Sequence, residues 1–64
     1  MDELSTKVIM YRAKHNLSQK ELGELIGVTG QMISFAESGK HIGKITKAKL
    51  EILFNEDKRK GEEK

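Results

Sequence analysis

Apolar residues recur at helical spacing on both sides of a glycine in residues 18–39. The stretch opens with the S-x-x-E pattern of a capping box, Ser18 and Glu21, in which each residue binds an unpaired backbone N–H of the other. The apolar residues that follow at i, i+3 and i+4 share one helical face, and they are Leu22, Leu25 and Ile26. The pattern predicts a short amphipathic helix.

A second short helix is predicted directly after the first. Gly27 stands where a chain leaving a helix adopts a positive φ, which is easy only for glycine. Val28 fills the turn, and Thr29 is a suitable cap for the next helix. The residues that share one face of that helix are Ile33, Ala36 and Glu37. Together the two segments predict a helix-turn-helix over about residues 18–38.

Residues 2–14 are predicted to form an earlier helix. An acidic residue, Asp2 or Glu3, opens it favourably with respect to the helix dipole. Its buried face is marked at i, i+4 and i+7 by Leu4, Val8 and Tyr11. The helix is expected to end at His15-Asn16, with Leu17 filling the gap before the helix-turn-helix.

A later helix is predicted from Lys44 to about residue 56 or somewhat beyond. Its helical spacing comes from Ile45, Ala48 and Ile52, and the residues that add apolar surface to it are Leu50, Leu53 and Phe54. No apolar residue follows Phe54, so residues 57–64 are either a charged extension of this helix or a disordered tail. The fold class expected is an all-α single domain over residues 1–56, with four or five helices.

The composition agrees with this fold class and argues against a disulfide-bonded, zinc-binding or membrane-spanning protein. The chain has 64 residues, no cysteine and no proline, and 34% of its residues are charged. A chain of this length can form only a small core, and it has no cysteines for a disulfide or a zinc site that would stabilise it. The absence of cysteine fits a reducing cytoplasm. The longest apolar runs are three or four residues, too short for a membrane span or a signal peptide.

No enzyme chemistry is visible. The histidines, His15 and His41, have no acid or cysteine at ligand spacing, so both are expected to be solvated loop residues. The serines lack the strand-turn-helix setting of a nucleophile. We therefore expect no catalytic residue, no metal site and no cofactor.

The distribution of charge says more than the net charge of +2. Residues 1–50 hold eight Lys or Arg against five Asp or Glu, whereas the last fourteen hold four against five. The basic excess therefore lies on the predicted folded part, as a surface that faces DNA requires.

Several residues of the predicted motif also carry a family resemblance. The matching segments are Ser18-Gln19-x-Glu21-Leu22, Gly27-Val28-Thr29, Ile33-Ser34 and Glu37-x-Gly39-Lys40, with Arg12 upstream. They resemble the helix-turn-helix DNA-binding domain of Cro and the phage repressors, over residues 4–40 and toward Leu53. The resemblance implies a lambda-repressor-like fold and an ion pair between Arg12 and Glu37 that locks the first helix to the third.

The resemblance also implies how the two helices of the motif divide the contacts with DNA. The first crosses the phosphate backbone and the second, residues 29–38, lies in the major groove. Phosphate contacts are expected from Gln19 and Lys40, and less strongly from Lys20 and Lys44, whose alternative is to be solvated charges.

Base contacts are expected from outward positions of the second helix. Gln31 can pair with adenine through two hydrogen bonds, and Ser34 can reach a base edge or a phosphate. Two other outward positions depart from the family pattern. Gly30 replaces a polar side chain, and Phe35 replaces a residue that is commonly Arg, Lys, Asn or Gln.

Met32 and Phe35 leave three interpretations open. Both residues could contact the major groove of DNA, or they could form an apolar partner interface with Ile42. In the third interpretation, Phe35 turns inward to fill the space beside the small Ala36. Leu53 and Phe54 either complete the core or form a docking edge for another subunit.

The function predicted first is that of a Cro-like transcriptional regulator of phage or bacterial genes, which binds double-stranded operator DNA in the cytoplasm. The alternative is a protein-interaction module that binds another regulator, such as a phage repressor, and a third is an antitoxin. Tight DNA binding by so small a module would need self-association. The chain after Phe54 does not support a Cro-like homodimer through a fifth helix.

Overall fold

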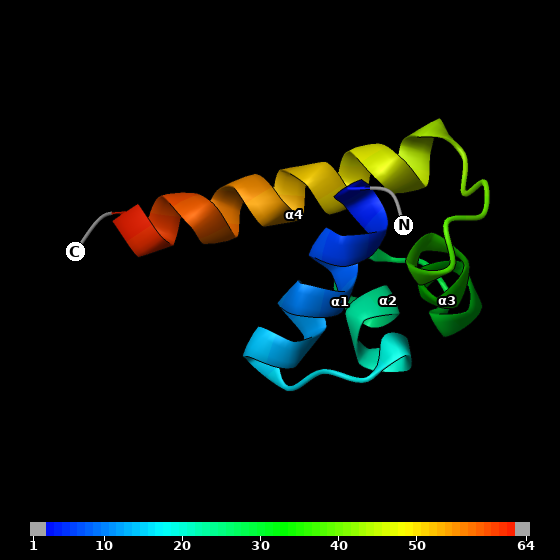
Figure 1. Cartoon of the computed structure of the whole chain (residues 1–64), viewed down its shortest axis with the longest axis horizontal. Helices are drawn as coiled ribbons and strands as arrows, with labels where there is room; N and C mark the ends of the chain where they lie inside the picture. Colours follow the sequence, from blue (N-terminus) through cyan, green and yellow to red (C-terminus); the bar gives the residue numbers. More distant parts are fainter. Residues whose placement is uncertain (1–2, 63–64) are drawn as a thin grey trace.

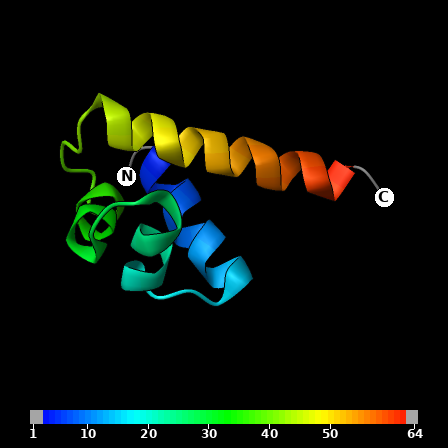
Figure 2. The same cartoon turned by 180° about the vertical axis from the view of Figure 1, so that it is seen from behind.

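In the computed structural model, residues 3–62 are described, with side chains over residues 3–58, and the described residues form four helices and no strand. The helices are α1 (Glu3–His15), α2 (Gln19–Ile26), α3 (Gly30–Glu37) and α4 (Lys44–Glu62). Helices α1, α2 and α3 form a group that α4 crosses on one side, and the carboxyl half of α4 extends beyond the group (Figures 1 and 2). The predicted all-α class is confirmed.

The local signals at the ends of α2 and α3 are confirmed. The Ser18 hydroxyl accepts a hydrogen bond from the Glu21 N–H at 3.0 Å, and the Ser18 N–H donates to the Glu21 carboxylate at 2.8 Å. Gly27 ends α2 in the left-handed region at φ 78°. Thr29 caps α3 by accepting from the Met32 N–H at 3.2 Å. These caps fix where both helices begin.

A close approach inside the turn requires Gly23, which the sequence did not single out. A Cβ at this position would lie 2.6 Å from the Val28 carbonyl oxygen, closer than real Cβ contacts. The Val28 N–H donates to the Gly23 carbonyl at 2.8 Å. The backbone of the turn therefore packs directly on the middle of α2, and a larger residue would push α3 away from it.

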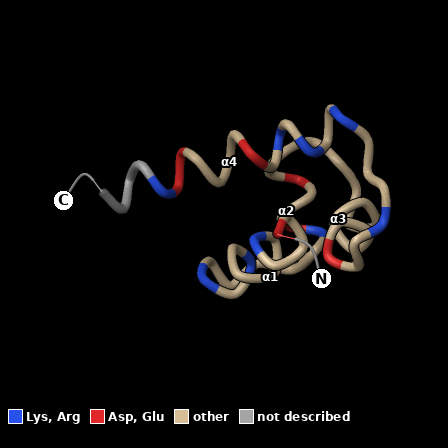
Figure 3. Tube along the Cα trace, turned by 45° about the horizontal axis from the view of Figure 1, so that its top comes forward, with Lys and Arg blue, Asp and Glu red and all other residues tan. Residues whose placement is uncertain are grey.

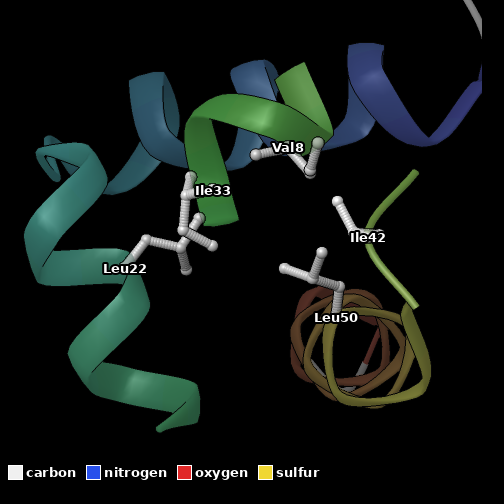
Figure 4. Packing of buried hydrophobic residues seen from close by; sticks show 6 residues of the cluster. Val8, Leu22, Ile33, Ile42 and Leu50 are labelled. Atoms are coloured by element: carbon white, nitrogen blue, oxygen red, sulfur yellow. The ribbon is translucent and has the colours of Figure 1, made fainter. Parts of the chain in front are cut away.

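The core takes side chains from every helix and from the loop before α4. The buried apolar residues are Val8, Leu22, Ile33, Ala36, Ile42 and Leu50. Figure 4 shows these side chains converging, with the labelled Leu50 pointing from α4 toward α1 and α3. The partly buried residues around them are Leu4, Tyr11, Leu17, Ile26, Val28, Phe35, Leu53 and Phe54.

The apolar stripes that predicted α2 and α4 are only partly buried. Leu25 shares its face of α2 with the buried Leu22, yet its side chain is 59% exposed. On α4 the residues whose spacing predicted the helix are exposed, with Ile45 at 74% and Ile52 at 60%. The core instead takes Leu50, because α4 has apolar residues on two faces and meets the other helices through only one.

The carboxyl end of α1 is tied to α4 by a contact that the sequence did not indicate. Asp57 accepts from Lys14 Nζ at 2.9 Å and lies 2.9 Å from His15 Nε2. Tyr11 lies between the rings of His15 and Phe54, at centroid distances of 4.3 and 5.6 Å. His15 is therefore a helical residue with partners, and the prediction of a solvated loop histidine is wrong.

The pKa of Asp57 falls below its ordinary value because Lys14, and secondarily His15, hydrogen-bond to it, while desolvation opposes the shift. These contacts hold α4 against α1 beyond Phe54. The helix continues to Glu62, so residues 57–62 extend α4, which is one of the two alternatives that the sequence left open. No helix among residues 3–62 is long and apolar enough to cross a membrane.

Replacing Leu50 by alanine tests the position of the core. Leu50→Ala is expected to lower the free energy of unfolding by about 3 kcal/mol, because it leaves a cavity among fully buried side chains. Met10→Ala, at a residue that is 64% exposed, is expected to change it by less than about 0.5 kcal/mol. Urea denaturation followed by circular dichroism at one protein concentration measures both, and equal effects of the two variants would contradict this core.

Candidate nucleic-acid interface

An ion pair between Arg12 and Glu37 joins α1 to the end of α3. Arg12 Nε donates to Glu37 Oε2 at 2.5 Å, and a terminal guanidinium nitrogen donates to Oε1 at 3.1 Å. Only 25% of the Arg12 side chain and 12% of the Glu37 side chain are exposed. The remaining terminal nitrogen of Arg12 donates to the Leu17 carbonyl at 3.0 Å. The pair thus connects α1, the α1–α2 connection and α3.

A buried hydroxyl group holds the backbone of the same residue. Ser5 Oγ donates to the Glu37 carbonyl oxygen at 2.5 Å, and Ser5 is fully buried. On α1, Ser5, Val8 and Arg12 recur at i, i+3 and i+7, so they lie on the face that meets α3. This spacing was the available signal for Ser5, which sequence reasoning missed because a serine does not stand out on an apolar face.

Gln19 completes the arrangement from the first turn of α2. Its side-chain nitrogen donates to Glu37 Oε1 at 3.1 Å. Because a carboxamide nitrogen carries two hydrogens, this bond leaves one hydrogen of Gln19 for another acceptor. The Gln19 side chain is therefore positioned by Glu37.

Hydrogen bonding changes the ionisation of both partners. Hydrogen bonding to Arg12 holds the pKa of Glu37 below its ordinary value; desolvation by burial opposes this shift, and Gln19 adds to it. The pKa of Arg12 is raised, chiefly by its hydrogen bond to Glu37. The charge of the Glu37 carboxylate is therefore paired with that of Arg12, and together the two residues add no net charge beside α3.

Gly30 was expected at an outward position of α3, but it lies against α2. A Cβ on Gly30 would lie 3.1 Å from both the Cα and the backbone nitrogen of Lys20, so the residue faces α2. The absence of a side chain lets the first turn of α3 approach the first turn of α2 closely. The unpaired N–H groups at the amino ends of the two helices are thus brought near each other.

The remaining outward residues of α3 differ in exposure. Gln31 is exposed, whereas Met32, Ser34 and Phe35 are partly buried. Phe35 packs against the core, and Lys40 Nζ lies 5.3 Å from the centroid of its ring. The polar residue available at the start of α3 is therefore Gln31, with Ser34 one turn further along.

The exposed apolar patch predicted from Met32, Phe35 and Ile42 lacks one of its members. Ile42 is buried, so it cannot join Met32 and Phe35 in an exposed patch. Leu53 and Phe54 also pack against the core. The interpretation in which Leu53 and Phe54 complete the core is the one that matches these contacts.

The candidate phosphate-binding lysines, Lys20, Lys40 and Lys44, are all exposed. Figure 3 shows Lys and Arg residues gathered along the α3–α4 connection and the first turns of α4. Lys47, one turn after Lys44, is also exposed and was missed by the sequence reasoning. Its spacing of three residues from Lys44 was the available signal.

Comparison with known proteins agrees with this geometry. A family model described as helix-turn-helix matches residues 8–56, which include the whole of α2 and α3. The chain belongs to the Cro/C1-type helix-turn-helix family. This is a family of DNA-binding transcriptional regulators and not of enzymes.

Two relatives of this helix-turn-helix chain come from Archaeoglobus fulgidus, and both are named uncharacterized HTH-type transcriptional regulators. One is 33% identical, over 80% of this chain and 84% of the relative. The other is 32% identical, over 80% of this chain and 86% of the relative. No solved structure matches the chain significantly.

Removing the charge of Glu37 tests the ion pair. Because its pKa is lower in the folded chain, Glu37 stabilises the fold above its unfolded pKa of about 4.3, and this stability is lost as the pH falls through the folded pKa. Glu37→Gln is expected to lower the free energy of unfolding by about 2–3 kcal/mol near pH 7, below the full loss for a deeply buried pair. The difference from the wild type should shrink near about pH 3.

Urea denaturation at both pH values measures this difference, with Glu24→Gln, at an exposed carboxylate of α2, as the control. The assigned role of the pair would be contradicted if Glu37→Gln had the free energy of unfolding of the wild type at neutral pH. It would also be contradicted if the difference in this free energy stayed the same in acid.

Proposed function

We propose that this chain is a small Cro-like transcriptional regulator that binds double-stranded operator DNA by placing α3 in the major groove. The observation that carries the proposal is the position of Gln31. It is exposed in the first turn of a helix whose other end is clamped to α1 by Arg12 and Ser5. A fixed helix with a polar amino end is the element that reads bases in helix-turn-helix proteins.

Direct reading of bases is assigned to Gln31 and Ser34. The Gln31 carboxamide matches adenine N6 and N7 with one donor and one acceptor. Ser34, three residues later, lies on the same side of α3 and can donate to a base edge or to a phosphate. Phe35 contributes apolar surface beside Lys40 and is a candidate for contact with a thymine methyl group.

Contacts with the phosphate backbone are assigned to two places beside α3. At the amino end of α2, Gln19 keeps one free hydrogen and Lys20 adds charge. On the other side of α3, Lys40 and Lys44 extend from the connection to α4. Such contacts place the protein on the duplex without reading its sequence.

The exposed surface of α3 favours DNA over a protein partner. The interface with another regulator that the sequence predicted would need Met32, Phe35 and Ile42 in one exposed apolar patch. Ile42 is buried, and Phe35 packs partly against the core. The archaeal relatives named as transcriptional regulators support the same choice. A regulator of this kind acts in the cytoplasm, where the operator DNA is. The cell is either the bacterium whose genes it regulates or, for a phage protein, the bacterial host.

Exchanging single residues separates base reading from phosphate binding. Gln31→Ala is expected to weaken binding to the operator by roughly 5- to 150-fold and to relax the preference at one base pair. Lys40→Gln should weaken binding to every duplex similarly and reduce the slope of log affinity against log salt by about one.

Fluorescence anisotropy with a duplex from the chain's own promoter region and a scrambled duplex, at two salt concentrations, measures both effects. Lys58→Gln is the matched control, because it removes one exposed lysine far along α4. Equal wild-type affinity for the two duplexes, or unchanged selectivity in Gln31→Ala, would contradict the proposal.

A further inference from the structure

A groove of 390 Å³ lies between α1 and the carboxyl half of α4. Met10 of α1 lines it and is 64% exposed, and the partly buried rings of Tyr11 and Phe54 line it as well, with their centroids 5.6 Å apart. Methionine is flexible and adapts to apolar partners of different shape, which makes it common at binding surfaces. The floor of this groove is therefore an adaptable apolar surface that residues 3–58 leave uncovered.

The walls of the groove are basic. Its lining includes Lys7, Lys14 and Lys58, and its one acidic residue, Asp57, is already bound to Lys14. Lys7 pairs with Glu3, but the two side chains are 53% and 84% exposed, and such a pair is easily exchanged for another. A lysine ammonium has three hydrogens, so Lys14 can bind Asp57 and a second carboxylate together.

Two of the lysines and the methionine follow one face of α1. Lys7, Met10 and Lys14 are separated by three and four residues, so their side chains form one stripe along the helix. The two lysines are about 10 Å apart along the helix axis, with Met10 between them. A second helix laid along this stripe would place an apolar residue on Met10 and an acidic residue, one turn to either side, against each lysine.

We propose that this groove binds a short amphipathic helix of another protein, in which an apolar residue has an acidic residue one turn away on each side. The charge of the groove selects this partner, because its lysines attract carboxylates and repel a second basic segment. A second copy of the groove would bring lysines against lysines, and a nucleic acid would have no apolar side chain to cover Met10.

The position of the groove keeps it separate from α3. The carboxyl half of α4 points away from α3, which lies beside the opposite end of that helix (Figures 1 and 2). The groove therefore stays open when α3 is occupied, and the proposal does not depend on what α3 binds.

Amide chemical shifts of the full chain during titration with a synthetic peptide test the proposal. The probe is an alanine-based peptide of about 20 residues, long enough to form a helix in water, with two glutamates seven residues apart and a leucine between them. It is expected to bind with a Kd below about 1 mM and to shift the amides around Met10 and Phe54. A peptide with glutamine in place of both glutamates is expected to bind roughly 3- to 10-fold more weakly, because it loses two exposed ion pairs.

A charge placed on the floor of the groove distinguishes it from the rest of the surface. Met10→Glu is expected to weaken binding of the acidic peptide by roughly tenfold or more, because it brings a carboxylate against the leucine and between the two glutamates. Ile52→Glu is the matched control, since it makes the same change at a side chain of similar exposure, 60% against 64%, that does not line the groove. Circular dichroism verifies that both variants keep their helices.

Four results would overturn the proposal. The first is the absence of any shift at millimolar peptide, and the second is equal binding of the acidic and the glutamine peptides. The third is equal binding of the acidic peptide by Met10→Glu and Ile52→Glu. The fourth is a set of shifts concentrated around Lys40 and Lys44, which would mean that the peptide acts only as a polyanion.

Discussion

The position of α3 depends on the partly buried ion pair between Arg12 and Glu37. A carboxylate withdrawn from water must have its charge and its lone pairs satisfied, and Glu37 receives hydrogen bonds from both Arg12 and Gln19. Arg12 uses its remaining terminal nitrogen on the Leu17 carbonyl. One charged pair therefore joins α1, the α1–α2 connection, α2 and α3. In a domain with so few buried apolar side chains, such a pair also specifies one arrangement of the helices, because any shift of α3 would leave a charge without its partner.

Local signals in the sequence predicted the helix-turn-helix correctly, and the failures came where a prediction depended on distant parts of the chain. The capping box of Ser18 and the left-handed Gly27 involve residues within a few positions of each other, so their residue types indicate the geometry directly. On α4, apolar residues occupy two faces, and periodicity cannot tell which face meets the other helices. Asp57 contacts residues more than forty positions away, which no local pattern indicates.

The candidate site was predictable to a similar extent. The spacing and the family resemblance selected Arg12, Glu37 and Gln19, and all three lie in one hydrogen-bonded group. They could not indicate that Gly30 faces Lys20, because that depends on how closely α2 and α3 approach each other.

The helices present two different outer surfaces. The surface around α3 is polar and flanked by lysines, whereas the side of α4 that carries Ile45 and Ile52 is apolar.

Amide chemical shifts measured by NMR during titration with a duplex from the chain's own promoter region test the central claim most directly, that α3 is the surface that binds DNA. The largest changes are expected in the first turns of α2 and α3, at Gln19, Lys20, Gln31 and Ser34, and around Lys40. Changes should be small along α4 from Ile45 to Glu56. The account would be contradicted if the shifts were concentrated on α4, or if saturating DNA left the amides of α3 unchanged.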